Sequence, residues 1–518
     1  LALNGTTNSE ALASNSLADT YGLGTLTSVT RVLNATNALD VWNPAASNRT
    51  PQQVINELRS DYRGSDINSD LNNVRLKFDG PLFELPGGPI RVAFGGEYWE
   101  YHNYIRNISS NGAGPGNSSS RVVYAPLART NWSGFAEFFV PVISPEMGIP
   151  LGQSFELNVA ARYDQYSDVG ATRNPRIGFT WKVADGLKWR ANYGTSFTAP
   201  NLAYLNPVIT GSVGASTATF TVPAGHPALQ GNNVCSATPT NCVFDNTRPG
   251  LSLGIGNPEL KPMTGLTYST GFDLDAGSLW QPLQGLTMDV TYWQVKFQGG
   301  LTAVTLDNDL NLTGLQNLFT LAPPGGWSLS DPFIQNAIAG NALTTNLPTT
   351  INYIAQTGRR NAFNIQANGI DFGVHYSFLT DNYGDFTVGF NGAEKLRFDL
   401  QGGPKGSTAP YQNMLNGRLD TSTIKATQFE GRLSTRWHMD PFGVSLMTNF
   451  TNPYWFHTTV PPFNGLTDAP AGLAPTGFQK VRANITVDLF VDYDLPADWL
   501  YGASEGVKLT VGGHNILN

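Results

Sequence analysis

Long runs in which apolar and polar residues alternate are the feature that most restricts what this chain can fold into. In residues 155–163, 429–437 and 481–493, apolar residues recur at odd-numbered positions while the even-numbered positions are mostly polar or charged. Successive side chains of a strand point to opposite faces of its sheet. Each run therefore predicts a β-strand with one apolar face and one strongly polar face.

Two architectures contain strands of this kind, and strand length distinguishes them. A soluble sandwich packs its apolar faces together, whereas a transmembrane barrel turns them to lipid and its polar faces to the lumen. An apolar band about 25 Å tall, crossed at about 45°, needs about 11 residues per strand. Sandwich strands usually have about five or six. The runs here extend over about ten to fifteen residues, which favours the barrel.

The barrel interpretation predicts which face of each strand contacts lipid and which face contacts the lumen. A charge on the lipid face near the midplane costs about 2–4 kcal/mol, so the charged positions are predicted to face the lumen. These positions are Glu156, Arg162, Arg190, Glu430, Arg432, Arg436 and Arg482. The positions predicted to face lipid are Val159, Trp189, Leu433, Ile485 and Val487.

The connections between the runs fall into two length classes. The links at residues 86–89, 185–186 and 439–443 are short, and Asp185-Gly186 is a typical hairpin turn. The long links are residues 103–127, 199–260, 299–361, 399–425 and 457–479. Bacterial outer-membrane barrels have short periplasmic turns and long extracellular loops. The segregation of lengths therefore predicts an all-β, antiparallel transmembrane β-barrel.

About fourteen strands are expected on this basis. They lie near residues 67–84, 90–103, 128–144, 154–166, 173–184, 187–198, 261–275, 286–298, 361–378, 384–398, 425–438, 443–457, 480–495 and 505–517. Aromatic residues gather at run ends, as at Tyr98, Trp99 and Tyr101, which an interfacial girdle explains; the alternative is a set of packed core aromatics. Residues 67–518 are therefore interpreted as barrel with its loops, and residues 1–66 as an extracellular loop region.

Two short helices are expected inside the connecting segments. Thr50-Pro51 and Ser330-Asp331-Pro332 each place a capping residue and a Pro before a short helix-compatible stretch. The first helix falls in the loop region at residues 1–66. Long loops are usually functional or disordered, and helices within them favour folded, functional loops.

Composition excludes several other classes of protein. Charged residues make up 14% of the chain, against about 25% in a typical soluble protein. No apolar run approaches the roughly 18 residues that a membrane-spanning helix needs. The formal net charge is −8 and the pI is near 5.3, without a basic stripe, so nucleic acid is not an expected partner.

Cys235 and Cys242 lie close together in a polar segment rich in Pro, Thr and Asn. Such a pair suits a local disulfide, which would place the segment in an oxidising compartment. Two unpaired loop thiols are the alternative.

Motifs of catalysis are not found in the sequence. It has no phosphate-binding loop, zinc-binding HExxH helix or GxSxG elbow. Its six histidines, His102, His226, His375, His438, His457 and His514, are scattered singly. An enzyme, a metal site and a bound cofactor are therefore not expected.

Four segments together resemble the TonB-dependent outer-membrane receptors. Asn-Pro-Arg-Ile-Gly-Phe-Thr-Trp at 174–181, followed by Leu-Lys-Trp-Arg-Ala-Asn-Tyr-Gly-Thr-Ser-Phe-Thr-Ala-Pro at 187–200, is similar to a barrel hairpin of this family. Thr198 stands where the family usually has Arg. Phe-Glu-Leu-Pro-Gly-Gly-Pro-Ile-Arg-Val at 83–92 is similar to an earlier hairpin, Gly-Asn-Pro-Glu-Leu-Lys-Pro at 256–262 to a strand entry, and Val-Gly-Gly-His-Asn-Ile-Leu-Asn at 511–518 to the penultimate strand.

The resemblance implies a location, an architecture and partners. Members cross the outer membrane of Gram-negative bacteria with a 22-stranded barrel that encloses an N-terminal plug domain. About fourteen strands are visible here, so this chain is expected to lack the plug and the last strand. The implied partners are the TonB energy-transducing complex, acting through the plug, a small-molecule or chelate ligand, and outer-membrane lipid and lipopolysaccharide.

The resemblance also implies a function, which is TonB-dependent active uptake of a scarce solute. Siderophore-bound iron is the first class to consider because it is the commonest in the family. Two alternatives stay open: a passive porin-type diffusion channel, and a surface β-protein outside any membrane. Long loops favour the receptor over the porin.

Candidate ligand-binding residues are those at loop entries whose side chains grip solutes. Arg359 and Arg360 are adjacent, and two guanidinium groups can hold an anionic chelate or a carboxylate. Aromatic rings and an imidazole at other loop entries can stack on a ring or sugar; these are Tyr204, Tyr411, Trp455 and His457. The alternative is that all six are ordinary rim residues, with the arginines paired to surface carboxylates or lipopolysaccharide phosphates.

Overall fold

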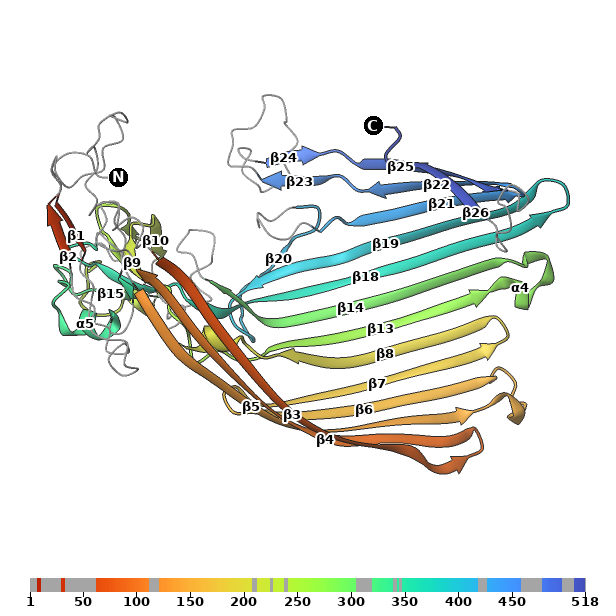
Figure 1. Cartoon of the computed structure of the whole chain (residues 1–518), viewed down its shortest axis with the longest axis horizontal. Coiled ribbons are helices and arrows are strands. Elements are labelled where there is room, and N and C mark those ends of the chain that lie inside the picture. The colour runs from red at the N-terminus through yellow and green to blue at the C-terminus, as the bar shows by residue number, and fades with distance from the viewer. Residues whose placement is uncertain are drawn as a thin grey trace, which may run out of the picture.

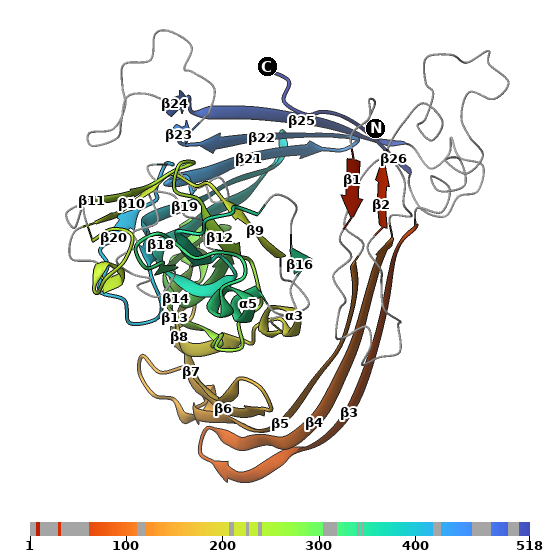
Figure 2. The same ribbon diagram turned by 90° about the vertical axis from the view of Figure 1, so that its left-hand side faces the viewer.

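An antiparallel β-sheet dominates the computed structural model (Figure 1). The structure describes residues 7–10, 29–32, 62–110, 121–206, 212–223, 227–236, 241–303, 319–338, 342–343, 347–417, 426–457, 478–495 and 507–517. The sheet has 15 strands, of which 14 form one continuous path while the short β20 (Tyr411–Asn413) pairs with β19. Figure 2 shows this sheet as a curved trough whose two edges are β3 and β26.

The strands of the path follow one another in nearly the order of the chain. They are β3 (Tyr62–Leu85), β4 (Gly88–Ser110), β5 (Arg121–Ile143), β6 (Ser154–Tyr166), β7 (Gly170–Ala184), β8 (Leu187–Thr198), β13 (Met263–Asp275), β14 (Leu286–Ala303), β18 (Arg359–Thr380), β19 (Gly384–Gly402), β21 (Phe429–Met439), β22 (Phe442–Thr451), β25 (Asn484–Leu495) and β26 (Val507–Gly513). Each of the predicted runs is one of these strands, so the predicted all-β antiparallel architecture is confirmed.

Two boundaries differ from the prediction. β3 begins at Tyr62 rather than at residue 67, so the predicted division at 66/67 falls inside a strand. β4 continues to Ser110 and β5 begins at Arg121, within the segment 103–127 that was interpreted as a loop. Polar and apolar residues do not alternate in 103–110 and 121–127, so the pattern that identifies a strand is missing there although the backbone pairing continues.

The register places the residues predicted to face lipid on one face of the sheet. Val159 pairs with Ile177, Trp189 with Phe272, and Leu433 with Phe390. Residues directly opposite in an antiparallel pair share a face. Large apolar side chains are exposed along this outer face, among them Leu76, Phe94, Trp132, Ile177, Phe272, Val290, Leu433, Leu446, Ile485 and Val511.

The predicted lumen positions lie on the opposite, inner face. Glu156 and Arg162 alternate with Val159 on β6, and the charged positions of β21 alternate with Leu433. One predicted lumen position and one predicted lipid-facing position differ from the others. Arg482 precedes β25 and is not in the sheet, and Val487 is on the outer face by register but only 8% exposed. The backbone N–H of Ile516 donates to the carbonyl of Val487, so the chain beyond β26 lies beside it.

The two rims of the sheet carry different connections, as the lengths in the sequence predict. On one, the turn rim, the links between path strands are brief: residues 86–87, 144–153, 185–186, 276–285, 381–383 and 440–441. They contain η1 (Pro145–Met147), α4 (Ala276–Leu279) and η3 (Gln281–Leu283). On the other, the loop rim, the links at 199–262 and 304–358 are long, and only the link at residues 167–169 is a tight turn among the described ones.

The two longest links fold together into a small body, the cap, formed by the described residues of 212–253 and 319–356. Its five-stranded sheet has the order β15 (Phe319–Leu321), β17 (Tyr353–Gln356), β12 (Gly250–Leu253), β9 (Ser212–Ser216) and β16 (Ala342–Leu343). β12 from the first link pairs in parallel with β17 from the second. Figures 1 and 2 show the cap across the loop-rim end of the trough.

The cap has its own apolar core in two clusters. One contains Val213, Leu251, Ile334 and Ile354, and the other contains Phe220, Phe244 and Tyr353. β10 (Phe220–Pro223), β11 (Asn241–Phe244), η2 (Pro227–Leu229) and α5 (Pro332–Ile338) complete this body. Short elements of this size need such a core because they cannot bury apolar surface alone.

The two helices expected from the sequence have different outcomes. The second is confirmed as α5, where the Asp331 side chain accepts a hydrogen bond from the backbone N–H of Phe333 at 2.8 Å. The first, after Thr50-Pro51, lies outside the described residues.

β1 (Thr7–Glu10) pairs with β2 (Val29–Val32), and β23 (Tyr454–His457) pairs with β24 (Phe478–Val481). Within the described ranges, no helix has the length and apolar character to cross a membrane.

Candidate functional site

Arg359 and Tyr204, two of the residues singled out in the sequence, meet at the loop rim. α3 (Leu202–Leu205) follows β8, and its Tyr204 ring lies under the guanidinium carbon of Arg359 at 4.3 Å from the ring centroid. This distance is typical of a cation–π contact. Arg360, the next residue of β18, points to the opposite face of the strand and is partly buried near the carboxylate of Glu259. The structure therefore joins one arginine to one aromatic residue, at the base of the cap.

The other candidates lie at separate places on the loop rim. The Tyr411 hydroxyl accepts a 2.8 Å hydrogen bond from Gln366, and the Arg397 guanidinium lies over its ring. Lys480 of β24 lies over the Trp455 ring of β23. His457 ends β23, and its side chain is outside the described part of the structure. These residues and the Arg359–Tyr204 pair do not form one site.

Cys235 and Cys242 are joined by a disulfide whose Cα atoms are 5.6 Å apart. Both are buried in the cluster with Phe220, Phe244 and Tyr353. Their bond ties β11 to the segment after η2. It therefore holds together one part of the cap core rather than an exposed loop.

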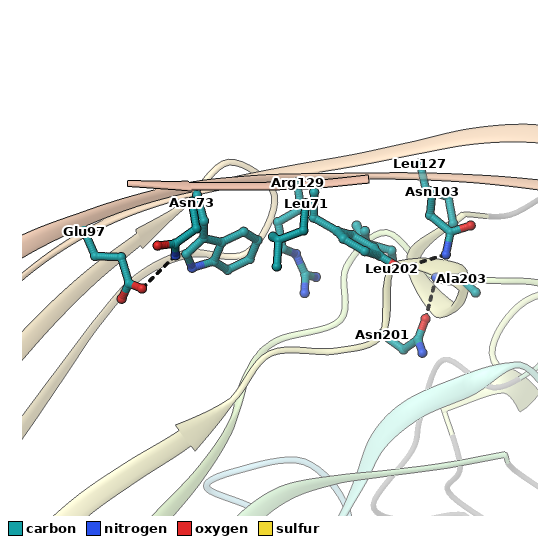
Figure 3. A pocket seen from close by; sticks show the side chains of 11 residues that line it. Leu71, Asn73, Glu97, Asn103, Leu127, Arg129, Asn201, Leu202 and Ala203 are labelled. Atoms are coloured by element: carbon teal, nitrogen blue, oxygen red, sulfur yellow. Dashed lines mark hydrogen bonds between the residues drawn. The ribbon is translucent and has the colours of Figure 1, made fainter. Parts of the chain in front are cut away.

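A hollow on the inner face of β3, β4 and β5, the inner pocket, lies toward the loop rim of the trough (Figure 3). Its volume is about 530 Å³, within the range of about 300–1,000 Å³ that small-molecule sites occupy. It is lined by Leu71, Asn73, Glu97, Trp99, Tyr101, Asn103, Leu127, Arg129, Asn201, Leu202 and Ala203. Strand side chains form one wall, and the start of α3 forms the facing wall.

Glu97, at one end of the inner pocket, is nearly buried and belongs to a polar network whose arginines reach the solvent. Its side chain accepts hydrogen bonds from Asn73 at 2.8 Å, Arg75 at 2.6 Å and Arg162 at 3.2 Å. Arg162 also binds Asp164, whose side chain is 1% exposed. Buried carboxylates are stable when such partners satisfy them, so this network joins β3, β4 and β6 across the inner face.

Arg129 points into the middle of the inner pocket, between the Glu97 end and the Leu127 and Asn103 end (Figure 3). It is 8% exposed, pairs with Asp168 at 2.7 Å and donates to the carbonyl oxygen of Pro200 at 2.7 Å. Asp168 is in the turn between β6 and β7, and Pro200 leads from β8 into α3. Arg129 therefore fixes the α3 wall to the sheet.

α3 also connects the inner pocket to the cap. Asn201 caps α3 by accepting a hydrogen bond from the N–H of Ala203, and both residues line the pocket. One residue further on, the Tyr204 carbonyl accepts a 2.7 Å bond from the N–H of Asn257, just after the first cap segment. With Arg359 on its ring, Tyr204 is held from two sides at the cap base.

A second hollow of about 510 Å³ lies near the turn rim. Its lining includes Lys188, Arg190 and Asp273, and Asp273 pairs with Lys188 at 2.8 Å and with Arg190 at 3.2 Å. In the part of the chain that the structure describes, no cluster of three His, Cys, Asp or Glu residues can hold a metal ion.

The sequence does not predict the inner pocket, and one prediction about its aromatic residues is wrong. Tyr98, Trp99 and Tyr101 were interpreted together as girdle residues. Tyr98 does lie on the outer face, 47% exposed, but Trp99 and Tyr101 line the inner pocket. Strand alternation alone could have predicted this, because it places Trp99, Tyr101 and Asn103 on the face opposite Tyr98.

These features define an open, curved antiparallel sheet of the membrane-barrel type, with folded loops over one rim and a lined hollow on its inner face. The chain belongs to the TonB-dependent receptor-like β-barrel family, whose sequence profile matches residues 3–516. Membership implies a location in the outer membrane of Gram-negative bacteria. No curated protein sequence matches the chain.

Solved structures similar to this chain are outer-membrane receptors and transporters. The outer-membrane transporter YddB from Escherichia coli has 9% identity, a TM-score of 0.51, and coverage of 88% of this chain and 51% of its own. The siderophore receptor PirA from Acinetobacter baumannii has 12% identity, a TM-score of 0.48, and coverage of 86% and 51%. A ferric enterobactin receptor from Pseudomonas aeruginosa has 14% identity, a TM-score of 0.47, and coverage of 87% and 49%. The chain spans about half the length of these structures.

Proposed function

We propose that this protein is an outer-membrane receptor for TonB-dependent active uptake of a scarce solute. The observation that carries the proposal is the family match over residues 3–516, combined with a sheet whose loop rim bears a folded cap. In this proposal the loop rim faces the cell exterior and the turn rim faces the periplasm. The outer apolar face contacts lipid and, toward the exterior, lipopolysaccharide.

The TonB energy-transducing complex is the proposed inner-membrane partner, and it acts through a plug domain. The proposed barrel portion with its loops begins at Tyr62, the first residue of β3, rather than at residue 67. Siderophore-bound iron is the first solute class to test, because ferric chelates are the commonest cargo implied by the family resemblance. The protein is proposed to be a transporter rather than an enzyme.

Uptake by cells that carry the full-length protein tests the function. Radiolabelled solute is expected to accumulate only when the inner membrane is energised and TonB is present. Accumulation that persists without TonB would support the porin-type channel. Recovery of the protein as a soluble monomer without detergent would support the surface β-protein.

Arg359 at the cap base and Arg360, which points to the opposite face of the same strand, are proposed as solute contacts. The Arg359 guanidinium lies against Tyr204 through its face, which leaves its N–H groups at the edge to donate to oxygen acceptors. Replacing both Arg359 and Arg360 by Ala is expected to weaken solute binding to whole cells by about tenfold. Surface abundance is expected to stay unchanged.

The matched control is the replacement of Lys261 and Lys405 by Ala. Both lysines are exposed at the loop rim, so this variant removes the same charge from the same side of the protein. Equal binding losses in the two double variants would show a general charge effect. Undiminished binding in the arginine variant would contradict the assigned contact.

A further inference from the structure

We propose that the inner pocket binds one ring of a neutral saccharide. The proposal rests on the receptor function argued above and names the class of solute that this pocket takes. Three observations carry it. The pocket has an aromatic surface, amide groups surround that surface, and its charged side chains are already paired with other groups of the protein.

The aromatic surface comes from one strand. Trp99 and Tyr101 are two residues apart on β4, so both side chains are on the inner face. The Trp99 ring is held by an edge contact with Tyr166 at 5.7 Å between centroids, and the Tyr101 hydroxyl accepts a 2.9 Å bond from Asn103. Leu71, Leu127 and Leu202 enclose the same space. A sugar ring has C–H groups on its faces that pack against such a surface.

Amide groups surround this apolar surface. Asn73, Asn103 and Asn201 line the inner pocket, and each amide has both donors and an acceptor. A sugar hydroxyl also donates and accepts, so it can bond with either end of an amide. The Oδ1 atom of Asn103 has no hydrogen-bond partner among the described residues. A buried acceptor in that condition calls for a missing partner, and a bound hydroxyl or its water supplies one.

The charges of the lining are already matched within the protein. Glu97 is satisfied by Asn73, Arg75 and Arg162, and Arg129 by Asp168 and the Pro200 carbonyl. Arg129 is the only cation among the lining residues. An anionic chelate entering here would have to break a nearly buried ion pair, which is strongly unfavourable. A neutral solute leaves every pair intact.

Binding to the purified full-length protein in detergent micelles tests the proposal. The probes are three neutral trisaccharides, maltotriose, xylotriose and N-acetylchitotriose, with ferric citrate as the anionic comparison. Calorimetry is expected to show binding of at least one trisaccharide and none of ferric citrate to the inner pocket. Trp99→Ala is expected to weaken the trisaccharide by about tenfold or more.

Trp132→Ala is the matched control because Trp132 is on the outer face of the neighbouring strand β5, 53% exposed. It is expected to bind like the parent. Leu202→Trp fills the pocket from the α3 side without altering the sheet, and it is expected to abolish binding even if Trp99→Ala fails to fold.

Three results would overturn the saccharide site: no binding of any trisaccharide, equal binding by the Trp99 and Trp132 variants, or ferric citrate binding that Leu202→Trp removes. Each leaves the proposed function standing if TonB-dependent uptake of another solute is observed. Loss of TonB dependence, in contrast, would remove the receptor function while leaving a measured trisaccharide affinity intact.

Discussion

Replacing Tyr353 by Ala is expected to unfold the cap while the large sheet stays paired. The Tyr353 side chain is fully buried, with its ring 5.1 Å from that of Phe220 and 4.9 Å from that of Phe244. Its hydroxyl donates to the Ser216 side chain at 2.9 Å. Burial raises the pKa of the phenol, so the hydroxyl stays protonated and keeps donating. Truncating a buried aromatic residue costs about 3–5 kcal/mol, which a body as small as the cap cannot absorb.

Hydrogen–deuterium exchange is the measurement because it reports on each segment separately. Peptides from residues 241–253 and 351–356 are expected to exchange much faster in Tyr353→Ala, and peptides from β6 and β7 at the parent rate. Tyr353→Phe keeps the ring and loses only the hydroxyl bonds, at a cost of about 1 kcal/mol. Phe333→Ala removes a ring that is 46% exposed on α5 and is expected to change little. Parent-like protection of 241–253 in Tyr353→Ala would show that the cap does not depend on this core.

The large sheet could be predicted from the sequence because each of its strands carries its own evidence. A strand that crosses a membrane needs about eleven residues, which gives several cycles of alternation. β6 and β25 are examples, with polar Glu156 and Asp488 on the face opposite Val159 and Ile485. Neighbours in the sheet follow the order of the chain, even where a long link separates them, as between β8 and β13 or β14 and β18.

The cap could not be predicted because its strands have two to five residues and its central pairing is distant in sequence. Leu251 of β12 pairs with Ile354 of β17, and these belong to different links. A period of two cannot be recognised in so few residues. The disulfide and α5 were visible because each has a local signature, a close pair of cysteines in one case and Asp331-Pro332 in the other.

The candidate site was predictable in its parts but not in its assembly. The sequence placed Tyr204 and Arg359 at loop entries, yet their contact depends on how α3 turns back beneath the cap. The inner pocket depends on the register between β3, β4 and β5, which brings Asn73 opposite Trp99 and Trp99 opposite Asn131. A single strand does not specify that register, because pairing partners set it.

The outer apolar face leads to the second large effect, which is expected for Leu433→Arg. Leu433 is in the middle of β21, 41% exposed, between Phe390 and Thr448 on the neighbouring strands. A charge at such a position near the bilayer midplane costs about 2–4 kcal/mol, because the guanidinium loses its water without gaining a partner. The free energy of unfolding from lipid vesicles, measured by denaturant titration of tryptophan fluorescence, is expected to fall by that amount.

Ser434→Arg is the matched control, because the adjacent side chain has the opposite orientation. Ser434 is on the inner face with Arg432 and Arg436, between Gly389 on β19 and Met447 on β22. An arginine there stays in polar surroundings, so its cost is expected to be below about 1 kcal/mol. If both variants lost the same free energy, strand distortion rather than lipid contact would explain the effect. A larger loss for Ser434→Arg than for Leu433→Arg would reverse the assignment of the two faces, and with it the position of the inner pocket inside the barrel.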